Sequence, residues 1–202
     1  QQQQLVQQAL QRFRPLLLLI GFPCTLWNLL NENCNYYYRM HELETMREEQ
    51  RPLLRWTCEI IKEQANMGNY FIFESSLRCR IWDEPCVQEL NDLPGALTVT
   101  ADAGAFGATD RDGHPIIKPH KFIVNSSEIA QVLHRRLSAQ ERQVCKPLEG
   151  INVTLSQEYP DDMVRAILRA LKKLARALSP NRFDLHQVCV AQPVDDAETW
   201  KK

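Results

Sequence analysis

The sequence lacks an excess of charge of either sign, a long hydrophobic run and any paired cysteine motif. Lysine and arginine (24) nearly balance aspartate and glutamate (25), so the net charge of −1 indicates no nucleic-acid or membrane surface as a partner of the whole chain. The run LLLLI at 16–20 is far shorter than the roughly 18 apolar residues that span a bilayer, and it has no basic leader. We therefore expect a soluble intracellular protein, nuclear or cytoplasmic, with no membrane partner.

The cysteines form neither a disulfide framework nor a metal motif. Their number is odd and no CxxC pair occurs, which is typical of free thiols in a reducing compartment. The five histidines are equally dispersed, so we expect no metal site. The seven cysteines are Cys24, Cys34, Cys58, Cys79, Cys86, Cys145 and Cys189.

The length of 202 residues fits one domain, and we assign it to 1–178 with a carboxyl-terminal tail at 179–202. Helix-like and strand-like stretches alternate along it, which is typical of an α/β sheet whose strands are mostly parallel and buried. Predicted strands are 16–21, 70–73, 96–102 and 121–125, and predicted helices are 2–14, 39–67, 85–93, 126–137 and 159–178.

Local signals refine these elements. Pro52 is expected to kink or split the helix at 39–67, which Gly68 ends. The stretch 28–37 has no steady period and is predicted to be a loop. Helix 159–178 is strongly amphipathic, with its basic residues on the outer side. Its inward residues are predicted to be Met163, Ile167, Leu168, Leu171, Leu174 and Leu178.

Two reactive side chains follow predicted strands. Cys24 comes after LLLLIGFP, and Glu74 ends the strand YFIF. In open parallel sheets functional groups gather beyond the carboxyl ends of the strands. A thiol and a carboxylate on neighbouring strands would therefore meet at one edge, where the thiol could act as a nucleophile.

The order strand, G-x-P-C-T, helix, NYFIFES resembles the paired motifs of the DNA (cytosine-5) methyltransferases. In that family one strand delivers G-x-P-C to the target base and the next ends in F-x-x-E-N. The resemblance implies that Cys24 adds to carbon 6 of a flipped-out cytosine and that Glu74 holds or protonates ring nitrogen 3. Pro23 would rigidify the loop and, with Thr25, bind substrate. Ser75 stands where the family usually has asparagine, and Phe22 where it often has proline.

A second stretch extends the resemblance to phage-type and retroelement-associated members. ADAGAFG is followed by a version of K-P-T-x-x-x-T-N in which Lys118, Pro119 and Asn125 match. His120 and Val124 stand at the threonine positions. The resemblance covers roughly 15–175 and implies a partial Rossmann-like methyltransferase sheet, with Lys118 and Asn125 beside the substrate and DNA as a partner.

The resemblance also implies S-adenosylmethionine as cofactor. In the family a glycine-rich loop after a first strand and an acidic residue after the second hold it, and only a glutamine-rich helix precedes LLLLIGFPC. The glycines of ADAGAFGATDRDG do not open a helix in the dinucleotide-binding manner, and 110–113 fits a turn. We therefore expect a domain incomplete at its amino terminus, truncated or inactive, that transfers no methyl group by itself.

Two other classes of function stay open. A cysteine hydrolase would need a histidine beside Cys24, and His41 and His120 are the candidates. A non-catalytic protein or nucleic-acid interaction module derived from a mobile element would use the amphipathic helix 159–178 or exposed strand edges. The basic run at 134–136 and the basic side of helix 159–178 are either solvated surface or phosphate contacts.

Overall fold

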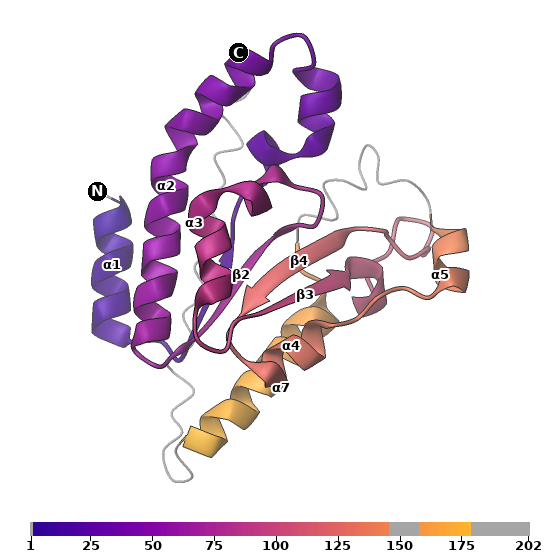
Figure 1. Ribbon diagram of the computed structural model, residues 1–202. Helices are drawn as coiled ribbons and strands as arrows, with labels where there is room; N and C mark the ends of the chain where they lie inside the picture. Colours follow the sequence, from indigo (N-terminus) through magenta and orange to yellow (C-terminus); the bar gives the residue numbers. More distant parts are fainter. Residues whose placement is uncertain (1, 146–157, 179–202) are drawn as a thin grey trace.

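The structure is a computed structural model that describes residues 2–145 and 158–178 (Figure 1). The predicted tail at 179–202 lies outside these residues, as does Cys189. The strands are β1 (Leu17–Gly21), β2 (Tyr70–Ser76), β3 (Leu97–Asp102) and β4 (Pro119–Val124). The helices are α1 (Gln2–Phe13), α2 (Met40–Asn66), α3 (Pro85–Gln88), α4 (Ser127–Leu133), α5 (Ala139–Val144) and α7 (Asp161–Leu178).

The described strands form one mixed sheet in the order β1-β2-β4-β3. β1 and β2 are parallel, whereas β4 runs antiparallel to both β2 and β3. The expectation of an α/β fold with flanking helices is confirmed, but the expectation of a mostly parallel sheet is wrong. The chain returns from β3 to β4 through the turn at 103–118 and has no crossover helix there, so the two strands must be antiparallel.

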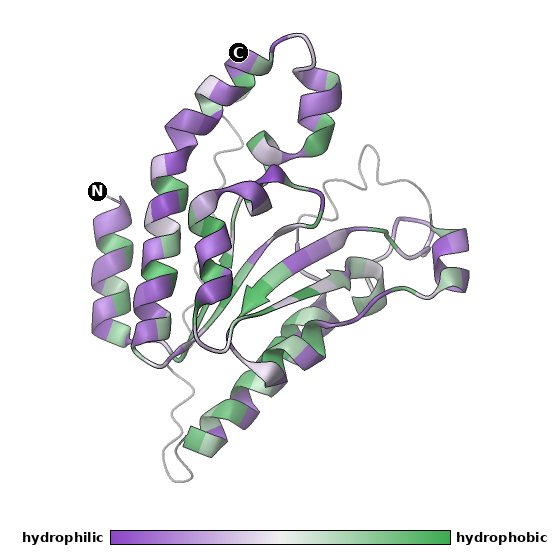
Figure 2. Ribbon diagram, viewed as in Figure 1, coloured by the Kyte–Doolittle hydropathy of each residue, from purple (hydrophilic) through white to green (hydrophobic). Residues whose placement is uncertain are grey.

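Helices cover both faces of the sheet, α2 and α3 on one side and α4 and α7 on the other (Figure 1). β2 alternates between the two cores, since Phe71 and Phe73 face α2 and Ile72 faces α7. In β1, Leu18 and Ile20 pack on the first core, while Leu17 and Leu19 pack on the second. A strand with two packed faces reads as a continuous apolar run, which explains LLLLI. Figure 2 shows the apolar strands between helices whose outer sides are hydrophilic.

The long helix α2 continues through Pro52 as one element, so it is not split there. Pro52 is exposed, whereas Leu54, Cys58 and Ile61 are buried and pack against the sheet. This packing offsets the backbone hydrogen bond that proline cannot donate. Gly68 ends the region with a φ of 75°, as its position predicts.

Two other predictions are refined or corrected, and a third is confirmed. Residues 28–37 include a short π-helical turn at Asn31–Asn35. On α7, Leu168 and Leu178 are 45% and 59% exposed, so they do not belong to the inward face, whereas Met163, Ile167, Leu171 and Leu174 are buried. Helix α4 begins as predicted, because the hydroxyl of Ser126 accepts a hydrogen bond from the amide of Ile129.

No helix among the described residues has both the length and the apolar composition that a bilayer crossing requires. Helix α1 leaves all its side chains outside the core, including Leu5 and Phe13.

Candidate active site

The carboxyl ends of β1 and β2 bring Cys24 and Glu74 to one edge of the sheet. Gly21, the last residue of β1, pairs with Glu74 of β2, and the amide of Phe22 donates a hydrogen bond of 2.9 Å to the carbonyl oxygen of Glu74. The turn that follows β1 carries Cys24. The pairing of Gly21 with Glu74 places both residues at the same ends of adjacent strands, and the charge of Glu74 raises the pKa of the Cys24 thiol.

Aromatic packing holds the turn that carries Cys24. The ring of Phe22 is buried, with its centroid 5.7 Å from that of Trp27 and 6.5 Å from that of Phe73. Trp27 in turn donates from Nε1 to Oε1 of Glu84 at 2.9 Å. These contacts anchor the turn on both sides of Cys24, which is itself half-buried.

Each oxygen of the Glu74 carboxylate has a partner. Oε1 lies 2.6 Å from Nδ1 of His120, and Oε2 accepts a hydrogen bond of 2.7 Å from the hydroxyl of Tyr159. His120 and Glu74 are diagonal neighbours across the β2–β4 ladder, because Ser76 pairs with His120 and Glu74 with Phe122. Glu74 is only 8% exposed, and the two partners compensate for burial of its carboxylate.

The ring of Tyr159 packs at a tilt of 45° against that of His120, with centroids 6.2 Å apart, and Tyr159 lies just before α7. Burial raises the pKa of its hydroxyl, and the nearby charge of Glu74 and the hydrogen bond to it act in the same direction. The hydroxyl therefore keeps its proton and acts as a donor to Glu74 at neutral pH.

The thiol of Cys24 is acidic for a cysteine. A hydrogen bond from the Cys79 thiol is the main cause that lowers the pKa of Cys24 to about 7. Burial and the negative charge of Glu74 oppose this effect, while the positive charge of Lys118 adds to it. A thiol with this pKa is about half ionised at neutral pH, and the thiolate is the nucleophilic form.

Lys118, a predicted substrate-binding residue, lies at the same edge. It directly precedes β4, whose amino end is next to the carboxyl end of β2. Burial lowers the pKa of its ammonium group, whereas the charges of Glu74 and Cys24 act to raise it. The site therefore combines a thiol, a carboxylate, an ammonium group and an imidazole.

The other predicted substrate-binding residues are divided. Pro23 and Thr25 flank Cys24 on the exposed turn. Asn125 lies beside the amino end of β2, at the other end of this strand from Glu74. Its Oδ1 accepts from the amide of Phe71 at 2.8 Å, and its Nδ2 donates to the carbonyl of Asn69 at 2.9 Å. The antiparallel direction of β4 causes this separation from Cys24 and Glu74, and the two hydrogen bonds of Asn125 join the end of β4 to the start of β2.

The histidines offer no Cys–His dyad among the described residues. His41 is exposed on α2. His120 uses Nδ1 for Glu74, and its buried Nε2 has no hydrogen-bond partner there. Asp110, Asp112 and His114 each bring one potential metal-ligand atom within 4.8 Å of the others. However, Oδ1 of Asp110 accepts from the amides of Asp112 and His114 at 2.9 Å, which is the pattern of a turn.

The glycine-rich stretch after β3 does not fit S-adenosylmethionine. A Cβ on Gly104 would lie 2.7 Å from the carbonyl oxygen of Ile116, so the chain itself fills the space beside this glycine. Asp102, at the end of β3, is fully buried, and its Oδ2 binds Arg136, Arg142 and the amide of Leu137. Within the described residues, therefore, neither the glycine loop nor the acidic strand end is available to hold that cofactor.

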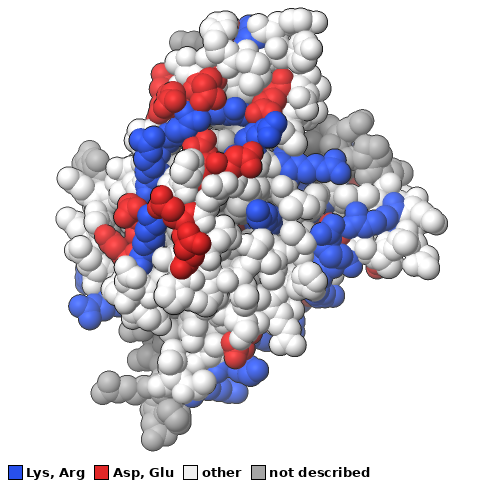
Figure 3. Space-filling model, viewed as in Figure 1, with Lys and Arg blue, Asp and Glu red and all other residues white. Residues whose placement is uncertain are grey.

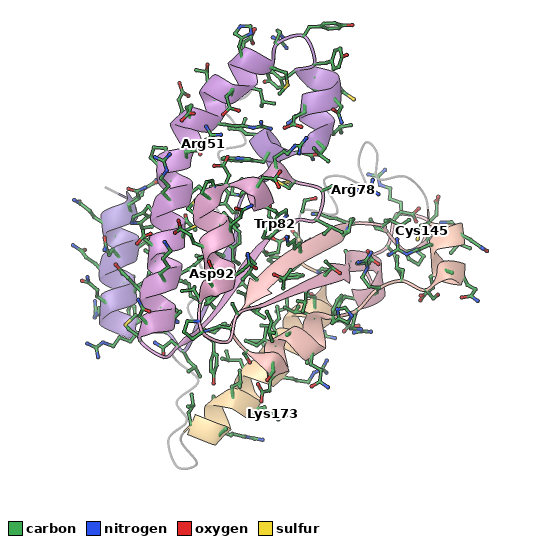
Figure 4. All side chains as sticks on the ribbon, in the orientation of Figure 1. Arg51, Arg78, Trp82, Asp92, Cys145 and Lys173 are labelled. Carbon is green, nitrogen blue, oxygen red and sulfur yellow. The ribbon has the colours of Figure 1, made fainter. Side chains whose placement is uncertain are left out.

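A large groove lies elsewhere, over α2 and the segment before α3. It encloses about 960 Å³, and acidic and basic side chains alternate along it (Figure 3). Arg47 pairs with Glu32 at 2.7 Å, and Arg51, labelled in Figure 4, pairs with Glu84 at 3.0 Å. Because these arginines are neutralised by the groove's own carboxylates, the groove has no net positive field for a phosphate backbone.

Sequence reasoning missed two members of the site. Tyr159 was predicted only as the start of an amphipathic helix, and it reaches Glu74 across 85 positions of sequence. Cys79 was one of several dispersed cysteines, and no local signal links it to Cys24. His120 was visible as a departure from the K-P-T pattern, although its pairing with Glu74 depends on the antiparallel ladder.

Comparison with protein-family models, with curated proteins and with solved structures finds no match to this chain.

Proposed function

We propose that this site binds and activates a cytosine base flipped out of DNA, as in the DNA (cytosine-5) methyltransferases, on a partial Rossmann-like sheet. The observation that carries the proposal is the position of Cys24 and Glu74 at the carboxyl ends of two adjacent parallel strands. The pKa of about 7 for the Cys24 thiol supports a nucleophilic role. The partners of Glu74 support a role in proton transfer.

In this mechanism the Cys24 thiolate attacks carbon 6 of the cytosine. A bond forms between Sγ and carbon 6, the π electrons of carbons 5 and 6 shift to form a double bond between carbons 4 and 5, and the π electrons of carbon 4 and nitrogen 3 move to nitrogen 3. Nitrogen 3 takes its proton from Glu74, which enters this step in its protonated form. Carbon 5 then has the electron density of an enamine. Nucleophilic addition is needed because carbon 5 of cytosine is unreactive until carbon 6 has been attacked.

The chain's other residues support this addition. Lys118 stabilises the thiolate before attack, because its positive charge acts on Cys24. His120 and Tyr159 hold the Glu74 carboxyl group at 2.6 and 2.7 Å, which fixes its orientation toward the base. Nδ1 of His120, the neighbour of Oε1, offers a route by which Glu74 regains the proton that it gives to the base.

S-adenosylmethionine would supply the methyl group that carbon 5 accepts. Because the described residues form no cradle for it, we propose that this chain performs base addition and that methyl transfer needs a cofactor-binding segment or subunit. The chain by itself is then inactive as a methyltransferase, although its nucleophile keeps its reactivity.

The DNA backbone would contact the rim of the site. Exposed Arg78 follows β2, and Lys121 of β4 lies with its Nζ 4.6 Å from the ring centroid of Trp82 (Figure 4). The basic run at 134–136 is less suitable, because Arg136 pairs with Asp102 at 2.9 Å and Arg135 stacks over Phe106. Contacts from Arg78 and Lys121 would weaken with salt, as phosphate contacts do.

A cysteine hydrolase is less well supported. The partner of the Cys24 thiol is the thiol of Cys79. The pKa of Cys24 is set mainly by Cys79, burial, Glu74 and Lys118, and by no histidine. General-base catalysis needs a histidine on the nucleophile, and His120 instead contacts Glu74.

Covalent trapping tests the proposal without a methyl donor. The probe is a DNA duplex pool of random sequence in which 2-pyrimidinone replaces one cytosine, because the missing amino group makes carbon 6 more electrophilic. We expect an adduct at Cys24 by intact-protein and peptide mass spectrometry. Cys24→Ala should abolish the adduct and Glu74→Gln should reduce it at least about tenfold.

Cys34→Ala is the matched control, since Cys34 is an exposed thiol outside the site and its loss should leave the adduct unchanged. Salt-dependent DNA binding without any adduct would favour the non-catalytic nucleic-acid module. An adduct on Cys34, or one equally strong in Glu74→Gln, would contradict the proposal.

A further inference from the structure

Two thiols from distant parts of the chain meet at the candidate active site. Sγ of Cys79 lies 3.9 Å from the carbonyl oxygen of Cys24, and the two side chains are hydrogen-bonded to each other. Cys79 lies in the segment after β2 and forms an isolated antiparallel bridge with Asn28, which is four residues after Cys24. This bridge holds Cys79 beside the turn that carries Cys24. Both thiols are free.

The two thiols differ in exposure and in acidity. Cys24 is half-buried on its turn, whereas Cys79 is 6% exposed, with Oγ of Ser75 3.9 Å from its sulfur. The pKa of Cys24 is lowered to about 7, mainly by the hydrogen bond from Cys79. That same hydrogen bond and burial raise the pKa of Cys79. Cys24 is therefore the thiol that an oxidant reaches first and in its reactive form.

We propose that Cys24 and Cys79 form a peroxide-reactive dithiol that closes to a disulfide, with Cys24 as the oxidised thiol and Cys79 as the resolving thiol. In the first step the Cys24 thiolate attacks hydrogen peroxide, the O–O bond breaks, and the hydroxide that leaves takes a proton to become water. Cys24 is now a sulfenic acid. In the second step the sulfur of Cys79 attacks the Cys24 sulfur, the S–O bond breaks, and the oxygen leaves as a second water with the proton of Cys79.

The local structure permits this closure. An S–S bond of about 2.05 Å requires the sulfurs to come closer than hydrogen-bond contact. Cys24 lies in the turn between β1 and the 3-10 helix at Thr25–Trp27, outside the ladder of the sheet, so the turn can supply the movement while Cys79 stays in its bridge. The disulfide would remove the proposed nucleophile reversibly and protect it from higher oxidation.

The chain contains a matched control pair. Cys58 of α2 and Cys86 of α3 are also hydrogen-bonded to each other. Burial is the main cause that raises the pKa of each of these thiols. This pair is also joined by a hydrogen bond, but burial keeps both of its thiols protonated at neutral pH. Selective oxidation of Cys24 and Cys79 would therefore follow from the acidity of Cys24 and not from thiol contact alone.

The test is titration of the full chain with hydrogen peroxide at neutral pH, followed by alkylation of the remaining thiols and peptide mass spectrometry. We expect a disulfide between Cys24 and Cys79 as the first product, with loss of two hydrogen atoms and full reversal by dithiothreitol. Cys58 and Cys86 should stay reduced at the peroxide concentration that converts the first pair. In Cys79→Ser, dimedone should label a sulfenic acid on Cys24 instead.

Several outcomes would overturn the inference. These are sulfinic acid on Cys24 in the unmodified chain without a disulfide, equal oxidation of Cys58 and Cys86, or earlier oxidation of exposed Cys34. Circular dichroism of Cys79→Ser shows whether that variant is folded. If it is not folded, the oxidation product of the unmodified chain, disulfide or sulfinic acid, decides between the two outcomes. The disulfide is read independently of the pyrimidinone adduct, so a chain that forms one without the other separates this inference from the proposed function.

Discussion

Nδ1 of His120 on β4 lies 2.6 Å from Oε1 of Glu74 on β2, across an antiparallel ladder. Glu74 belongs to the motif stretch NYFIFES, and His120 belongs to the later stretch that resembles K-P-T-x-x-x-T-N, where it stands at a threonine position. The contact therefore joins the two stretches that resemble the methyltransferase motifs. It places an ionisable side chain directly on the proposed proton donor. The carboxylate is then held by β4 and, through Tyr159, by the segment before α7.

The acidity of Cys24 should be visible in its alkylation rate. With a pKa of about 7, the rate of reaction with iodoacetamide should rise about tenfold per pH unit below pH 7 and level off above it. Peptide mass spectrometry resolves Cys24 from the other thiols. In Cys79→Ala the midpoint should move to higher pH, because the hydrogen bond that stabilises the thiolate is lost. An unchanged midpoint would show that Cys79 does not set the acidity of Cys24.

Replacement of His120 should destabilise the fold through Glu74. His120→Phe leaves Oε1 of a nearly buried carboxylate without its partner, which costs on the order of 1–3 kcal/mol of unfolding free energy. Urea denaturation measures the change. His41→Phe, at an exposed position of α2, is the control and should change stability by less than about 0.5 kcal/mol. Equal stability of the two variants would count against the buried pair.

A methyl group on Gly21 should disturb the site. A Cβ there would lie 2.7 Å from the hydroxyl oxygen of Tyr159 and 3.3 Å from Oε2 of Glu74. Gly21→Ala should therefore displace Tyr159 and lower the yield of the pyrimidinone adduct and the unfolding free energy. The double variant Gly21→Ala with Tyr159→Phe makes room, so the two effects on stability should be less than additive. Full additivity would show that Tyr159 does not occupy this space.

Loss of the two Asn125 hydrogen bonds should affect stability without affecting the thiol. Asn125→Ala removes a hydrogen bond to the amide of Phe71 and one to the carbonyl of Asn69, at a cost of about 1–3 kcal/mol in urea denaturation. The alkylation rate of Cys24 should stay the same, because Asn125 lies at the other end of β2 from Glu74. A large change in that rate would place Asn125 in the site after all.

Calorimetric titration with S-adenosylmethionine should give no heat of binding at micromolar concentrations for the folded chain. The reason is that Ile116 fills the space beside Gly104 and that Asp102 is already paired with arginines. Saturable binding would show a cofactor pocket built from other residues and would favour methyl transfer by this chain itself. The titration needs no nucleic acid, so it is independent of the trapping experiment.

Local features of the sequence determined most of the elements. The apolar run at 16–20 forms a strand because its side chains pack on both faces of the sheet, and Ser126 begins α4 because its hydroxyl caps the helix. The turn before β4 follows from Asp110 and from Gly113, whose φ of 85° suits glycine. Each of these signals acts within a few residues, which is why a sequence reveals it.

The directions of the strands and the partners of the reactive side chains were decided only by the tertiary structure. A strand buried on both faces has the same apolar pattern in either direction, so the sequence could not show that β4 is antiparallel. That direction places His120 beside Glu74 and carries Asn125 away from it. Contacts such as Cys24 with Cys79 and Glu74 with Tyr159 join residues 55 and 85 positions apart, and they exist only because the sheet and its helices pack together.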